Sequence, residues 1–186
     1  MTNRLIEFNT ERLRLRPWRM SDRAPFAALN ADSRVMEYFP GTLDGNTSDA
    51  LAERIGTQLA QRGWGLWAVE IPQACPFIGF VGLSVPADDI PLAPCVEIGW
   101  RLAHAHWGKG YASEAARGAL RVGFEMLGLA EIVSFTALRN TRSRAVMERI
   151  GMQCRDEYFE HPRLPEGHPL RLHVVYRISR ATWSCD

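Results

Sequence analysis

Apolar and polar residues follow regular periods along most of the chain, and these periods predict its strands and helices. Residues 10–18 alternate leucine with arginine, which is the period of a half-buried strand. The cap-like segments 21–22 and 46–49 each precede apolar residues at helical spacing, and the second helix is predicted to end near Gly63. Residues 35–41, between the helices, form an aromatic loop that either completes the core or walls a substrate site.

Three apolar runs follow, at residues 64–71, 76–85 and 95–101. Each run is short and bounded by turn-forming residues, so the three are predicted to be strands that pair antiparallel as a meander. Gly79 and Gly82 within the second run indicate a bulge or a close contact between backbones.

The last third of the chain alternates helices with strands. A helix is predicted from Tyr111 to about Gly128, and the β-rich run 132–137 that follows it is expected to lie parallel to the 95–101 strand. A further helix (140–151), two final strands (152–159 and 172–178) and a proline-rich loop between them (161–169) complete the pattern. The predicted fold class is α/β (α+β), with a mixed, mostly antiparallel sheet of about 6–7 strands.

The strand near the middle of the chain has two chemically different faces. By its period of two, Val96, Ile98 and Trp100 share one face, whereas Glu97 and Arg101 project from the other. Two ionisable side chains therefore lie on one side of a strand whose other side is apolar.

A glycine-rich turn, Trp107-Gly108-Lys109-Gly110-Tyr111-Ala112, separates this strand from the next helix. Such a turn at a helix N-terminus exposes backbone N–H groups at the positive end of the helix dipole, and phosphate is the usual ligand there. The Walker loop does not fit, because no Ser or Thr follows the lysine directly. The dinucleotide fingerprint does not fit either, because Ser113 stands where its third glycine belongs.

The turn resembles motif A of the GNAT acyltransferase family, Gln/Arg-x-x-Gly-x-Gly/Ala, and departs from it only at Trp107. Tryptophan there, after a Glu-Ile-Gly-aromatic strand, is similar to the branch that contains the ribosomal-protein N-terminal acetyltransferases. A second segment, from Asn140 through Ser143 to Gly151-Met152, resembles motif B of the family, whose usual ending is Gly-Phe. The order of predicted elements also matches the GNAT topology, which implies helices on both faces of the sheet and a splayed central pair of parallel strands.

The resemblance implies a binding site for acetyl-CoA. Its diphosphate is expected to bind mainly to backbone N–H groups of Gly108, Lys109, Gly110, Tyr111, Ala112 and Ser113. Main-chain groups of Trp100, Arg101 and Leu102 are expected to hold the pantetheine arm. The side chain of Lys109, the only lysine in the chain, either adds a charge to this site or is solvated.

Two residues are candidates for proton transfer. Glu97 is the candidate base for the acceptor amine, acting through water; the alternative is an ion pair with an arginine such as Arg101. Many GNAT enzymes protonate the departing thiolate with a tyrosine, but the corresponding position is Met147, so Ser143 is the candidate donor. Asn140 would then bind the pantetheine or the acyl end. The alternative is that Ser143 is only a helix-capping or N-terminal-turn serine.

Composition and charge limit the classes of partner. The net charge of +1 argues against broad nucleic-acid binding, and no run is apolar enough for a signal peptide or a membrane span. The scattered cysteines (Cys75, Cys95, Cys154 and Cys185) indicate reduced thiols in a cytoplasmic protein, and no spacing indicates a metal. Residues 1–186 are expected to form one domain, as a monomer or a homodimer.

The predicted function is N-acetyltransfer from acetyl-CoA to a primary amine in a ternary complex. The acceptor is either a protein N-terminus or a small amine, and the lack of an acidic stretch in loops 35–41 and 161–169 disfavours polyamines and aminoglycosides. The alternative from another class is a non-catalytic acyl-CoA-binding module, to which Met147 gives some support. A nucleotide-binding protein is the weaker third reading, because the Walker elements are missing.

Overall fold

The computed structural model describes residues 4–183 of the 186-residue chain. Within them a single sheet contains eight strands: β1 (Phe8–Asn9), β2 (Arg14–Arg16), β3 (Leu66–Ile71), β4 (Cys75–Ser84), β5 (Glu97–Leu102), β6 (Glu131–Ala137), β7 (Gln153–Glu160) and β8 (Leu172–Ser179). The helices are α1 (Arg23–Ala31), α2 (Gly45–Arg62), α3 (Tyr111–Arg121) and α4 (Thr141–Arg149), with short turns η1 (Met20–Asp22), η2 (His104–His106) and the π-helical η3 (Val122–Met126).

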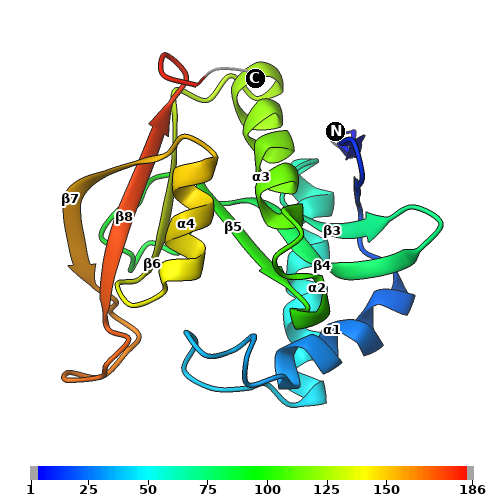
Figure 1. Cartoon of the computed structure of the whole chain (residues 1–186), viewed down its shortest axis with the longest axis horizontal. Coiled ribbons are helices and arrows are strands. Elements are labelled where there is room, and N and C mark those ends of the chain that lie inside the picture. The colour runs from blue at the N-terminus through cyan, green and yellow to red at the C-terminus, as the bar shows by residue number, and fades with distance from the viewer. Residues whose placement is uncertain (1–3, 184–186) are drawn as a thin grey trace.

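The sheet has the strand order β1-β2-β3-β4-β5-β6-β8-β7, and every neighbouring pair is antiparallel except β5 and β6. Figure 1 shows β5 and β6 side by side near the middle of the molecule. The predicted meander and the predicted parallel pair are both confirmed. The sheet has one strand more than the six to seven expected, because β1 forms a hairpin with β2 and is too short, at two residues, to show a period.

Helices cover both faces of the sheet, as the sequence predicted (Figure 1). On one face, α1 and α2 bury a cluster that includes Phe26 and Ile55 against Phe77 and Phe80 of β4. On the other face, the alanine-rich side of α3 and part of α4 pack on a larger cluster that includes Ile78 and Val81 of the same strand. One strand thus contributes residues to two different cores, although strict alternation is interrupted between Phe77 and Phe80, which face the same core.

Two glycines of β4 allow neighbouring backbones to approach closely, as the sequence indicated. Gly79 has a φ of +137°, and a Cβ there would lie 2.1 Å from the Arg101 carbonyl oxygen. A Cβ on Gly82 would lie 2.1 Å from the carbonyl oxygen of Gly65. No L-side chain fits either position without moving β5 or the start of β3.

Helix boundaries follow the expected caps with small shifts. The N-cap of α2 is Asp44, whose side chain accepts a hydrogen bond from the Thr47 N–H at 2.7 Å, so the helix begins slightly before the predicted 46–49 segment. The helix from Tyr111 continues through η3 and is followed by Gly128 at φ +68°. It therefore ends where the sequence predicted.

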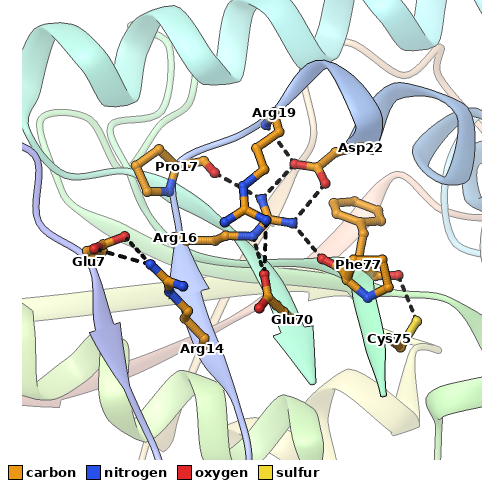
Figure 2. A network of polar contacts seen from close by, with 10 residues as sticks. Glu7, Arg14, Arg16, Pro17, Arg19, Asp22, Glu70, Cys75 and Phe77 are labelled. Atoms are coloured by element: carbon orange, nitrogen blue, oxygen red, sulfur yellow. Dashed lines mark hydrogen bonds and ion pairs between the residues drawn. The ribbon is translucent and has the colours of Figure 1, made fainter. Parts of the chain in front are cut away.

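A buried arginine joins the N-terminal strand to the rest of the sheet (Figure 2). The side chain of Arg16, on β2, is 1% exposed, and its guanidinium binds Asp22 through two bonds of 2.8 and 2.9 Å and Glu70 at 2.6 Å. The carbonyls of Pro17 and Pro76 accept its remaining two N–H groups. All five donors of one side chain are thus satisfied.

Candidate functional site

A cleft of about 1730 Å³ opens beside the parallel strand pair. It is lined by β5 and β6, by the glycine turn before α3, by the first turn of α4, by the loop between α1 and α2, and by the loop after β7. All of the predicted site residues line this cleft except Lys109. The structure therefore brings together residues from Glu97 to Ser143 around one cavity.

The cleft exists because β5 and β6 separate soon after they meet. Their register contains a single pair, Glu97 with Val133, and the Ser134 hydroxyl then donates to the Ile98 carbonyl at 2.9 Å. Residues two apart on a strand direct their backbone groups to the same side, so the N–H and C=O of Trp100 face the gap beyond Ile98. These groups are available to a ligand that lies along β5.

The glycine turn presents an uncapped helix N-terminus to the cleft. Gly108 and Gly110 have φ values of +72° and +80°, which glycine adopts at little cost. Gly110 is the N-cap of α3 and supplies no side-chain hydrogen bond, so the N–H groups of Tyr111, Ala112 and Ser113 lack helical acceptors. The turn is therefore a ready anion site.

The turn is held in place from the β1–β2 hairpin. Glu114, in the first turn of α3, accepts hydrogen bonds from the Thr10 hydroxyl at 2.6 Å and from the Arg12 backbone and side chain at 2.8 and 2.6 Å. Burial by itself raises the pKa of Glu114, but these bonds outweigh it and the pKa is lowered. Arg12 also donates to the Lys109 carbonyl at 3.1 Å and stacks on Tyr111. A charge contribution from the Lys109 side chain remains a prediction.

Glu97 lines the cleft, and among the described residues its carboxylate accepts one long hydrogen bond, from the Ser84 hydroxyl at 3.4 Å. Burial raises the pKa of Glu97 to about 8. The alternative ion pair with Arg101 does not form, and no other arginine in residues 4–183 pairs with Glu97. A carboxyl group with a pKa near that of an amine fits the role of a proton acceptor.

Arg101 points to the same side of β5 as Glu97 but is bound elsewhere. Its Nη1 donates to the side-chain oxygen of Asn30 at 2.6 Å, and the Asn30 amide in turn donates to the Ser48 hydroxyl at 2.9 Å. Its guanidinium lies 4.1 Å from the ring centre of Phe39. Burial lowers the pKa of Arg101 to about 10. Its predicted main-chain contact with a pantetheine arm stays a prediction.

Asn140 is the N-cap of α4 and positions Ser143. Its side-chain oxygen accepts from the Ser143 N–H at 3.1 Å, and its amide donates to the hydroxyls of Ser143 at 3.1 Å and Thr136 at 2.9 Å. The cap is therefore Asn140, not Ser143, and the Ser143 hydroxyl keeps its own proton for a further partner. Met147, at the position of the usual family tyrosine, is buried.

The aromatic loop between α1 and α2 does both things that the sequence left open. Val35 is buried in the α1–α2 core, whereas Tyr38 and Phe39 line the cleft. Arg142 of α4 pairs with Glu37 and stacks over Tyr38. The loop thus lines the cleft and is held in place by Arg142 of α4 and Arg101 of β5.

The loop after β7, which also lines the cleft, was predicted from the sequence as a loop, but its contacts were not. His161, which the sequence placed in a proline-rich loop, lies 4.9 Å ring to ring from His173, and both rings stack near Phe159. Burial lowers the pKa of both histidines. The Arg163–Asp89 ion pair, at 2.8 Å, joins this loop to the loop before β5.

Other sequence expectations concern groups away from the cleft. Cys75, Cys95 and Cys154 are free thiols, and Cys185 lies outside the described residues. Residues 4–183 contain no group of three His, Cys, Asp or Glu side chains that could hold a metal ion. In that same range, no helix has the length and apolar character needed to cross a membrane.

Comparison with known proteins identifies the family. The family model described as an acetyltransferase (GNAT) domain matches residues 12–153. The YkkB protein of Bacillus subtilis is 35% identical over 146 residues, which cover 77% of this chain and 83% of YkkB. A GNAT-family acetyltransferase of Bacillus anthracis has a similar structure, with a TM-score of 0.78 and 26% identity over 95% of this chain and 99% of that one.

The fold is also that of RimJ from Mycobacterium smegmatis, solved with CoA-disulfide. Its TM-score is 0.70 at 20% identity, over 90% of this chain and 81% of RimJ. The match of the family model, the glycine turn and the splayed strand pair agree with one another. This chain belongs to the GNAT family of acetyltransferases.

Proposed function

We propose that the cleft binds acetyl-CoA and that the enzyme transfers its acetyl group to a primary amine in a ternary complex. The observation that carries the proposal is the pairing of two features on one cavity: an uncapped helix N-terminus at Gly108–Ser113, and a diverging parallel strand pair that leaves Trp100 backbone groups unpaired. The first suits a diphosphate, and the second suits the amide groups of a pantetheine arm.

The residues of this chain would contribute to the reaction as follows. The Trp100 N–H is the backbone donor placed to polarise the thioester carbonyl. The Glu97 carboxylate, directly or through one water, takes a proton from the acceptor ammonium, so that the free amine attacks the carbonyl carbon. The C–N bond forms as the C–S bond breaks. The nitrogen then loses its second proton to the departing thiolate, to which the Ser143 hydroxyl donates a hydrogen bond, so that amide and free thiol are the products.

The pKa of Glu97 suits this exchange. An ammonium group beside the carboxylate favours its charged form, so binding of the acceptor lowers the Glu97 pKa from its value of about 8. The proton then moves from the acceptor ammonium to the Glu97 carboxylate, two groups with similar pKa values. Asn140 acts as a positioning residue, because both of its amide protons are used within the chain.

The test combines titration calorimetry of acetyl-CoA with release of free thiol in the presence of amines and peptides. We expect calorimetry to show binding of acetyl-CoA and no binding of ATP, and we expect thiol release to depend on the added amine. An enzyme that binds acetyl-CoA without releasing thiol would support the alternative, a non-catalytic acyl-CoA-binding module. Failure to bind acetyl-CoA would contradict both.

A further inference from the structure

Arg101 is a cation of the cleft without a counter-charge. No carboxylate in residues 4–183 forms an ion pair with it, and its Nε has no hydrogen-bond partner although it is shielded from water. The stacked ring of Phe39 and the oxygen of Asn30 compensate only part of the cost of removing a guanidinium from water. Such a group is stable when an anion completes its set of partners.

The guanidinium is also held in a fixed position. The chain Ser48–Asn30–Arg101 is continuous, and Asn30 and Ser48 are fully buried, so the Asn30 oxygen cannot turn away without leaving its own amide unpaired. Phe39 and Phe80 lie on the guanidinium at 4.1 and 5.5 Å. Two elements on one face of the sheet, α1 and α2, thus hold a cation at the cleft.

The surface between Arg101 and Glu97 is open. Both side chains project from the same face of β5, with Gly99 between them, and their Cα atoms are about 13 Å apart at the usual rise of a strand. A Cβ on Gly99 would have only one atom within 4 Å, the Glu97 Oε1 at 3.9 Å. A small molecule can therefore lie along β5 with one end at each charged group.

We propose that the acceptor carries a carboxylate as well as its amine: the amine is held at Glu97 and the carboxylate is bound by the free donors of Arg101. This inference rests on the proposed function and specifies its substrate class. The carboxylate belongs either to a free amino acid or to an acidic side chain at the start of a peptide. A planar, hydrogen-bonded guanidinium recognises a carboxylate through two parallel bonds, which an uncharged carboxamide cannot reproduce.

The test compares matched acceptors on the wild-type enzyme by acetyl-CoA thiol release. One arm pairs the free amino acids with their carboxamides, and the other pairs peptides that have Asp or Glu at position one or two with their Asn or Gln counterparts. We expect kcat/KM to be about 10- to 100-fold higher for the acid in one of the two arms. The arm in which this occurs identifies the source of the carboxylate.

The matched variants are Arg101→Met and Arg34→Met. Arg34 is an exposed arginine whose guanidinium is paired with Asp32, and it does not line the cleft. We expect Arg101→Met to abolish the preference for the acid and Arg34→Met to retain it. Binding of acetyl-CoA by each variant, measured by calorimetry, is the control for folding.

Two outcomes separate this inference from the proposed function. Failure of the wild-type enzyme to bind acetyl-CoA, or to release thiol with any amine, would contradict the proposed function. An enzyme that acetylates carboxamides as fast as acids, or that acetylates other amines but none of the carboxylated acceptors, would overturn the assignment of Arg101.

Discussion

Glu97 shows how one side chain obtains its chemistry from its place in the sheet. It belongs to the single backbone register pair of β5 and β6, Glu97 with Val133, so the strands shield it from water while the cleft leaves it accessible to a substrate. Burial raises its pKa to about 8. Below that pH the carboxyl group of the free enzyme is mostly protonated, and above it the carboxylate can accept a proton, as the proposed role of base requires.

The first prediction concerns the pH dependence of the wild-type enzyme and Glu97→Gln. We expect wild-type kcat/KM to rise with pH up to about 8. Glu97→Gln should lower kcat/KM by about 10²-fold below the pKa of the acceptor amine, with a smaller loss above it, where the amine is already neutral. Thiol release measured over a pH range that spans both pKa values checks this. Superimposable profiles would remove Glu97 as the base.

The second prediction concerns Ser143. Ser143→Ala should reduce kcat about tenfold and leave the affinity for acetyl-CoA nearly unchanged, because CoA thiolate is a good leaving group and the hydroxyl acts only as it departs. Ser143→Thr keeps a hydroxyl and is the matched control. If the alanine variant retains full kcat, Ser143 has only the structural contact with Asn140.

For single residues, the sequence predicted the face of the strand from which a side chain projects, but not its hydrogen-bond partners. The period of two placed Glu97 and Arg101 on one face of the strand correctly. The hydrogen-bond partner of Arg101, Asn30 of α1, is far away in the sequence, and no local pattern joins Asn30 to Ser48 of α2 and to Arg101. Pairing of Glu97 with Arg101 was plausible from their spacing, but the Arg101 guanidinium is bound by Asn30 and lies against Phe39 instead.

Among the elements, the turn that enters α3 has the clearest sequence signature, but the contacts that hold it in place cannot be predicted from the sequence. The spacing of Gly108 and Gly110 is by itself enough to indicate an anion site. The contacts that hold the turn, from Thr10 and Arg12 to Glu114, come from a hairpin about a hundred residues away. Its two-residue strand β1 is too short for any periodicity to reveal.

The third prediction uses two glycines in equivalent backbone conformations. Gly108 and Gly128 have φ values of +72° and +68°, and a Cβ on either would have no atom within 4 Å. Each change to alanine should therefore cost a similar amount of backbone strain, about 1–2 kcal/mol. Only Gly108→Ala should weaken acetyl-CoA binding, by about tenfold, as measured by calorimetry. Equal affinities in the two variants would argue against diphosphate binding at this turn.

For the molecule as a whole, the Arg16 network makes the N-terminal strand part of the sheet (Figure 2). The fourth prediction compares Arg16→Met with Arg14→Met. Arg16→Met leaves the buried Asp22 carboxylate uncompensated and should reduce the free energy of unfolding by about 3–5 kcal/mol. Arg14 pairs with Glu7 at 3.3 Å on the surface, so its loss should cost less than about 1 kcal/mol. Urea denaturation measures both, and similar costs would contradict the network's role.

The overall architecture also has a mechanical consequence. Strands β1 to β5 form one antiparallel ribbon and β6, β8 and β7 another, and within residues 4–183 the two ribbons share one backbone register pair, Glu97 with Val133. A ligand lying along the unpaired edge of β5 would supply the missing connection, as an additional strand does. Binding and release of the ligand in each catalytic cycle would then connect and disconnect the two halves of the sheet. In the free enzyme, amide exchange should be fastest along the gap between β5 and β6.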